Sequence, residues 1–337
     1  MLIDRELSCD ATISNWHVRE VSHSEWSVYW VDCAEQNLLQ SWEYGDAKEQ
    51  SGGWTPKRLV IFNQDNLPIA LVQVLTKCIP VLGGIARINR GPLLFDDDSM
   101  NYLELKLEAL KILMVEARRR RWWVIQIAPE ICDSYDASVG LQKLGLRKQK
   151  KTAWASSLMD LSLSIDDLYS NLNRRWKRAL IKASKSGVIV KNSELTEVRL
   201  AEVLKSYAGL QTRNQFVGID GKLIMELSKL KSPDWNVNLF VAELEIEGSA
   251  IEEVGYRVTI HNGRNVLDFL VSTNSKGRLV EANSALYWHA IVQAKKIGSR
   301  WFDVGGLSAE TPKGIADFKK GLNGTPYQLI GEFRKWF

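Results

Sequence analysis

The chain has 337 residues, of which 45% are hydrophobic and 25% are charged, and its formal net charge is +4. This composition is typical of a globular protein, and the length is sufficient for two domains of middling size. The longest apolar stretches, such as Pro68 to Leu75, are far shorter than the roughly 20 residues of a membrane helix. Met1 to Cys33 lacks the features of a signal peptide, so we expect a cytoplasmic protein without stable membrane insertion.

The first half of the chain predicts a hairpin, a strand, a helix and a strand, in that order. Leu59 to Phe62 and Pro68 to Leu75 are β-rich runs separated by a polar turn, and a third strand should include Ala86 to Asn89. Apolar residues at helical spacing predict a helix over residues 101–119, and Trp122 to Ala128 is a further β-rich run.

The same order of elements returns in the second half. The predicted hairpin, strand, helix and strand cover Leu239–Leu244 with Ala250–Ile260, Asn265–Ser272, Ala282–Lys296 and Trp301–Val304. Two copies of one mixed unit predict an α/β protein with mixed α+β sheets, built from a duplicated domain. The active cleft of such a protein should lie between or beside the copies.

A basic segment joins the two halves. Ser164 is suited to cap a helix with acids in its first turn, and a basic helix should follow over Leu172 to Ser186 and end at Gly187. The segment from residue 171 to residue 191 contains no acid, and its cations are Arg174, Arg175, Lys177, Arg178, Lys182, Lys185 and Lys191. Two interpretations stay open, a solvated helix face and a surface that binds phosphate groups.

Most enzyme classes with a local sequence signature are excluded. The chain contains no GxSxG elbow, no GxxxxGK[ST] phosphate loop, and no GxGxxG between a strand and a helix. Its four histidines lack metal-ligand spacing and its four cysteines form no CxxC pair, so neither a metal site nor a disulfide framework is expected. Attack of an amine on an activated ester or thioester remains, because it requires chiefly positioning and oxyanion stabilisation.

Four segments, taken in order, resemble the Fem family of tRNA-dependent peptidyl aminoacyltransferases, in its short form without a coiled-coil arm. They are Leu39–Lys48 (LQSWEYGDAK), Arg90–Pro92 (RGP), Arg174–Val190 (RRWKRALIKASKSGVIV), and Phe302–Gly306 (FDVGG) followed by Gly314–Lys319 (GIADFK). The resemblance implies two tandem acetyltransferase-like (GNAT) domains. The first, on the acceptor side, would comprise residues 1–155 and 325–337, with a returning strand at Tyr327 to Phe333. The second, on the donor side, would comprise residues 156–324 and carry the basic helix.

The resemblance also implies roles for individual residues. Lys319, with Phe318 anchoring its segment, would stabilise the oxyanion formed when an amine attacks an ester carbonyl. Lys48 would hold the nucleotide or phosphate end of the acceptor. Both lysines could also be ordinary surface residues. Further substrate contacts are expected at Trp42, Arg90, Trp123, Arg213, Asp303, Gly305 and Gly306, and contacts to tRNA phosphates at Arg174, Arg175, Lys177, Arg178, Lys182 and Lys185.

Two positions depart from the family's pattern and leave the acceptor open. Ala128 stands where an aspartate is often found, and Trp123 stands where a tyrosine is often found. The leading interpretation is transfer of an amino acid from aminoacyl-tRNA to an amine of a peptidoglycan precursor or a related peptide or sugar, nucleotide- or lipid-linked. We expect a monomer that uses no cofactor and makes at most peripheral membrane contact.

Two other functions remain. N-acyl transfer from acyl-coenzyme A is the runner-up, although residues 272–278 lack the [Q/R]xxGx[G/A] spacing that would bind pyrophosphate. A catalytically silent nucleic-acid-binding module would use the basic helix but would leave the Lys319 segment unexplained.

Overall fold

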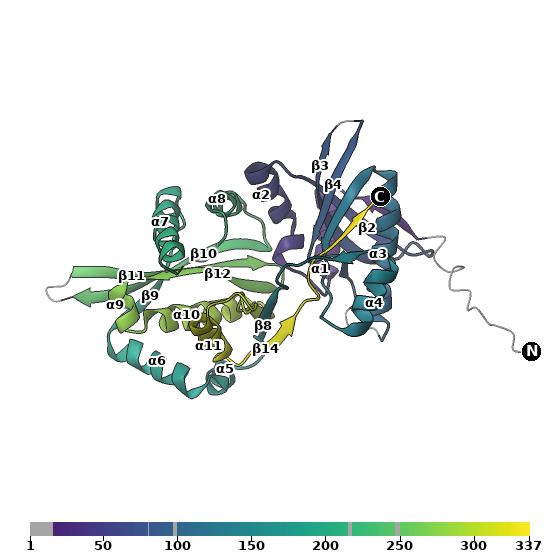
Figure 1. Ribbon diagram of the computed structural model, residues 1–337. Coiled ribbons are helices and arrows are strands. Elements are labelled where there is room, and N and C mark those ends of the chain that lie inside the picture. Colours follow the sequence, from purple (N-terminus) through teal and green to yellow (C-terminus); the bar gives the residue numbers. More distant parts are fainter. Residues whose placement is uncertain (1–15, 80, 97–99, 215–217, 247–249) are drawn as a thin grey trace, which may run out of the picture. The chain divides into compact units, whose positions relative to one another are not determined.

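The computed structural model describes residues 16–337 except 80, 97–99, 215–217 and 247–249, and it divides into two compact units (Figure 1). The first unit contains the chain up to Glu35, Gly53–Lys151 and Ile330–Phe337, and the second contains Gln36–Gly52 and Thr152–Leu329. Each unit has a mixed sheet with helices packed on it. The predicted fold class is therefore confirmed.

The sheet of the first unit has the strand order β1-β2-β3-β4-β6-β15-β7, and β5 pairs with β3. Neighbouring strands are antiparallel except β4 and β6, which are parallel. The strands are β1 (His17–Glu20), β2 (Thr55–Phe62), β3 (Pro68–Ile79), β4 (Gly83–Asn89), β5 (Leu93–Leu94), β6 (Trp122–Ala128), β7 (Arg147–Lys148) and β15 (Phe333–Trp336). The helices are α1 (His23–Asp32), α3 (Tyr102–Arg119) and α4 (Tyr135–Lys143).

The sheet of the second unit has the strand order β14-β8-β13-β12-β11-β10-β9, and only β12 and β13 form a parallel pair. Figure 1 shows α7 and α8 on one face of this sheet and α10 on the other. The strands are β8 (Ala155–Asp160), β9 (Val188–Ser193), β10 (Trp235–Ile246), β11 (Ala250–Asn262), β12 (Asn265–Thr273), β13 (Trp301–Asp303) and β14 (Thr325–Gln328). The helices are η1 (Leu38–Gln40), α2 (Trp42–Gly52), α5 (Ile165–Asn171), α6 (Arg174–Lys185), α7 (Glu197–Asn214), α8 (Gly221–Lys229), α9 (Ser275–Leu279), α10 (Ala282–Lys296) and α11 (Lys313–Lys320).

Each sheet has one strand inserted in the same topological place. In the first sheet, β15 lies between β6 and β7, and in the second sheet, β8 lies between β13 and β14. After β7 the chain therefore enters the second sheet as β8. After β14 it returns to the first sheet as β15. The strand that returns to the first unit is Phe333–Trp336, which is later in the chain than the predicted Tyr327 to Phe333.

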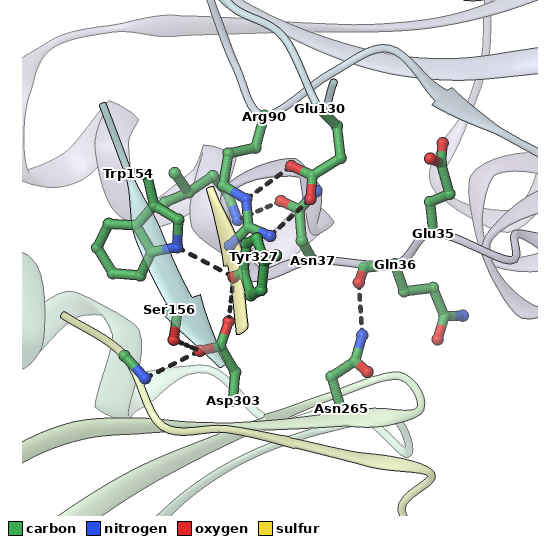
Figure 2. A network of polar contacts seen from close by, with 12 residues as sticks. Glu35, Gln36, Asn37, Arg90, Glu130, Trp154, Ser156, Asn265, Asp303 and Tyr327 are labelled. Carbon is green, nitrogen blue, oxygen red and sulfur yellow. Dashed lines mark hydrogen bonds and ion pairs between the residues drawn. The ribbon is translucent and has the colours of Figure 1, made fainter. Parts of the chain in front are cut away.

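Residues 36–52 and 325–329 belong to the second unit, whereas the sequence prediction placed them in the first domain. Helix α2 packs on α8, and the Ser232 hydroxyl donates to Glu43 Oε1 at 2.6 Å. Asn265 donates to the carbonyl of Gln36, as Figure 2 shows. At the other end, β14 pairs with β8.

Local sequence explains the helices that the prediction had placed. Helix α3 buries Ala109, Leu113 and Ala117 on one face, as the 3.6-residue period requires. The basic helix α6 begins after Asn173, whose side chain accepts from Trp176 N at 2.9 Å, and it is followed by Gly187 with a φ of 75°. None of the described helices is both long and apolar enough to span a bilayer.

Candidate functional site

The ammonium of Lys319 is held against the loop that follows β13. Its Nζ donates to the carbonyls of Val304 and Gly305, both at 2.7 Å, and lies 3.5 Å from Asp268 Oδ2. The side chain is only 14% exposed. Burial lowers the pKa of Lys319, Asp268 opposes this shift, and the nearby Arg257 guanidinium lowers the pKa further. The site is thus a sheltered cation whose charge is supported by two carbonyls and a carboxylate.

The loop itself depends on two glycines in the left-handed region. Gly305 has a φ of 62° and Gly306 a φ of 49°, a conformation that residues with a Cβ adopt at a cost. A Cβ at either position would lie 3.7 Å from Lys319 Nζ, and one at Gly305 would also lie 3.0 Å from the Asp268 carbonyl. Glycine therefore lets the backbone turn sharply beside the ammonium.

Asp303 fixes the other side of this loop (Figure 2). Its carboxylate accepts from the Ser156 hydroxyl, from Gly305 N at 2.9 Å and from the Tyr327 hydroxyl at 2.7 Å. The Tyr327 oxygen in turn accepts from Trp154 Nε1 at 3.0 Å. These contacts join β8, β13 and β14, so the loop is anchored to three strands of the second sheet.

A buried ion pair lies behind Lys319, and sequence reasoning missed it. Arg257 on β11 is fully buried, pairs with Asp268 on β12, and donates to Asn283 Oδ1 at 2.7 Å. Its guanidinium lies 3.8 Å from the ring centre of Tyr287, whose hydroxyl donates to Val304 O at 3.2 Å. Burial raises the pKa of Tyr287, so this phenol stays neutral. An arginine within the apolar run of β11 was the available signal in the sequence.

Phe318 connects the Lys319 helix to the basic helix. The rings of Phe318 and Trp176 are 4.4 Å apart, and Trp176 Nε1 donates to the Phe318 carbonyl at 2.6 Å. Tyr287 packs on the same pair, with ring distances of 5.6 Å to Trp176 and 6.0 Å to Phe318. Trp176 therefore fastens α6 to α11 one residue from Lys319.

Most of the cations of α6 lie on its exposed face. Within the described part of the chain, none of the exposed ones has an ion pair with an acid, whereas Lys177 is partly buried and donates to Ser170 O at 2.7 Å. The exposed cations are Arg174, Arg175, Arg178, Lys182 and Lys185. The exposed face of α6 is therefore a strip of positive charge that no acid among the described residues neutralises.

The remaining predicted contacts belong partly to the first unit and partly to the second. Trp42 and Lys48 lie on α2 in the second unit, and both are partly buried. Arg90 belongs to the first unit, where its guanidinium binds both oxygens of Glu130 at 2.7 and 2.6 Å. Trp123, also in the first unit, is 46% exposed on β6. Arg213 is in α7, but its side chain lies outside the described residues.

Comparison with known proteins shows what part of this chain, and its fold, is similar to. Residues 241–336 match the model of the FemAB family. The crystal structure of FemX is similar over 95% of this chain and 97% of that chain, with a TM-score of 0.78 at 16% identity. No curated protein sequence matches the chain.

Two further solved structures share the fold more loosely. A tandem GNAT protein from the clavulanic acid biosynthesis pathway is 8% identical with a TM-score of 0.55, over 95% of this chain and 98% of that chain. L-PGS from Bacillus licheniformis is 12% identical with a TM-score of 0.51, over 94% and 92%. The family model covers Asp303, the glycine loop and Lys319, and the fold is that of FemX. Residues 241–336 are therefore similar to the FemAB family, and the chain as a whole has a GNAT-like fold similar to that of FemX.

Proposed function

We propose that the protein transfers an amino acid from aminoacyl-tRNA to an amine of a peptidoglycan precursor or a related peptide or sugar acceptor of the cell envelope. The observation that supports this is the sheltered ammonium of Lys319 at the Gly305–Gly306 loop, inside the segment that matches the FemAB model. On this proposal the enzyme works in the cytoplasm as a monomer and uses no cofactor.

Lys319 would act on the oxyanion of the tetrahedral intermediate. The acceptor amine attacks the ester carbonyl of the donor, an amide bond forms, and the ester C–O bond breaks to release the tRNA hydroxyl with a proton. An ammonium has three donors, and two of them are used by Val304 and Gly305. The next acceptor, Asp268 at 3.5 Å, is at the limit of hydrogen bonding. The third donor would have to turn from this carboxylate to the oxyanion, where one such contact is worth about 2.7–4 kcal/mol.

The exposed cations of α6 would bind phosphates of the tRNA donor. Phosphate contacts position a nucleic acid without reading its sequence, and an unneutralised strip of Arg and Lys is suited to that role. Because Trp176 fastens α6 to Phe318, phosphates bound on α6 would lie on the same rigid block as Lys319. This arrangement would place the aminoacyl ester relative to the catalytic ammonium.

An acyl-coenzyme A donor is less compatible with the second unit. In the GNAT fold a helix N-terminus binds the pyrophosphate, because its free N–H groups and dipole attract anions. Here the acidic Glu281, with a φ of 58°, holds the N-cap position of α10. Its carboxylate would repel a pyrophosphate at that end of the helix.

A transfer assay tests the proposal directly. Purified protein is offered labelled aminoacyl-tRNAs or labelled acetyl-coenzyme A, with nucleotide-linked muropeptide or a cell-lysate pool as acceptor. We expect transfer from tRNA that Lys319→Ala lowers by roughly 100- to 1,000-fold. Lys320→Ala, which removes an exposed lysine from the same helix, is the matched control and should keep full activity. Transfer from coenzyme A alone would overturn the proposal.

A further inference from the structure

Large apolar side chains are exposed together at one end of the first unit. Val81 is 86% exposed and Leu82 57%, both in the turn between β3 and β4, and Trp123 is 46% exposed on β6. We call this surface the β3–β4 rim. It consists of Ile79, Val81, Leu82, Trp123 and Phe337.

Backbone and side-chain contacts bring the β3–β4 turn, Trp123 and Phe337 to one edge of the sheet. Arg121 donates to the Val81 carbonyl at 3.1 Å, which ties the turn to the start of β6. The Trp123 indole lies 2.9 Å from where a Cβ on Gly83 would be, so it covers the end of β4. Phe337 N donates to Trp123 O at 2.9 Å, which adds the segment after β15 to the same edge.

Cations lie beside Phe337 and beside the β3–β4 turn. The Arg118 guanidinium and the Lys335 ammonium each lie 5.5 Å from the ring centre of Phe337. Within the described residues, neither Arg118 nor Arg121 has an ion pair with an acid. Arg119 and Arg120, which lie between these two in the sequence, both form ion pairs with Glu116. The charges that remain beside the apolar side chains are therefore positive.

We propose that the β3–β4 rim docks the protein on the surface of an anionic lipid bilayer. Aliphatic side chains in a projecting turn can enter the boundary between headgroups and acyl chains, and tryptophan favours that interface. Arginine and lysine beside them match anionic headgroups, while their apolar stems can stay buried. A contiguous exposed apolar patch that is bordered by polar residues is typical of an interaction site.

Docking would bring the transferase to a lipid-linked acceptor. This use of the surface rests on the proposed function, whereas the docking itself rests only on the rim. The two can fail separately, because vesicle binding needs no substrate and transfer to a soluble nucleotide-linked acceptor needs no membrane.

Co-sedimentation of the full chain with vesicles tests the inference. We expect binding to vesicles that contain phosphatidylglycerol and much weaker binding to pure phosphatidylcholine. Val81→Ser with Leu82→Ser should weaken binding at least about tenfold, since two aliphatic side chains lose their burial. Arg118→Gln with Arg121→Gln should reduce both binding and its sensitivity to salt. Val198→Ser, at a 73% exposed aliphatic side chain on α7, is the matched control and should bind like the native chain.

Three outcomes would overturn the inference. The first is no difference between anionic and neutral vesicles, including no binding to either. The second is binding that survives the rim substitutions but disappears with Arg178→Gln and Lys182→Gln, which would assign it to α6. The third is self-association in gel filtration, abolished by the rim substitutions, without vesicle binding. Thermal melts of the rim variants should match the native protein, because the altered side chains are exposed.

Discussion

At Lys319, burial and local contacts act in opposite directions on the ammonium. Burial lowers its pKa below the ordinary lysine value of 10.5, while Asp268 favours the charged form. Only the charged form can stabilise an oxyanion, so kcat/KM should fall as the pH rises through this lowered pKa. The Lys319→Arg variant should keep whatever activity it has over this alkaline pH range, because a guanidinium stays protonated there. A pH profile with the same alkaline loss in native and Arg variants would contradict this assignment.

Lys106 and Glu35 form a buried pair in the first unit. Lys106 is fully buried and also donates to Pro92 O at 2.7 Å, and Glu35 accepts from the Tyr102 hydroxyl and from Leu94 N at 2.6 Å. Lys106→Met or Glu35→Gln alone should lower the free energy of unfolding by about 3–5 kcal/mol, because the partner charge stays buried. The double variant should lose less than the two single losses added together. Urea unfolding of all four proteins completes the cycle, and strict additivity would show that the pair is not coupled.

The residues of the site differ in how far the sequence could indicate them. Lys319 and the Gly305–Gly306 loop lie within short motifs of one segment, so the sequence could name them together, and their role stays a prediction. Arg257, Asp268 and Tyr287 come from β11, β12 and α10 and meet only in the folded sheet. Periodicity alone does not pair a charge on one strand with a charge on the next.

Elements with strong patterns were predicted well. Strand β6 and helix α10 have the predicted bounds, because one is a dense β-rich run and the other is a long run without Gly or Pro that ends at Lys295 and Lys296. Membership in a unit was harder to predict. Helix α2 has no clear apolar stripe, and only its packing on α8 shows that it belongs to the second unit.

The exposed face of α6 predicts a salt-dependent interaction with tRNA. Arg178→Gln with Lys182→Gln should weaken binding to all tRNAs to a similar degree, since phosphate contacts carry no sequence information. The slope of log K against log salt should fall by about one for each phosphate-binding side chain that is removed. Filter binding over a range of salt concentrations measures both quantities.

Lys143→Gln with Lys150→Gln removes two exposed lysines from the first unit and is the matched control. Equally weakened binding in the two double variants would mean that net charge, and not α6, determines the affinity.

At the scale of the whole molecule, the first unit depends on residues 330–337. Ile330 and Phe333 are fully buried in its core, and β15 separates β6 from β7. Deleting residues 330–337 should therefore destabilise the first unit and leave the second sheet with all its strands. Hydrogen exchange should show reduced protection in β4 and β6 and retained protection in β10 to β12. Removing Phe337 alone should have little effect, and a uniform reduction across both units would mean that they unfold together.

The place of β15 also governs when the protein can fold during its synthesis. The strands from β1 to β7 leave the ribosome early, yet the position between β6 and β7 stays open until β15 has been made. The nascent chain therefore carries two unpaired strand edges while the whole second unit is being synthesised, and such edges invite wrong pairing. Closure of the first sheet is the most non-local step of the fold and should be slow. A chain that terminates before β15 would never complete that sheet, and the edge of β6 that β15 covers in the finished protein would stay exposed.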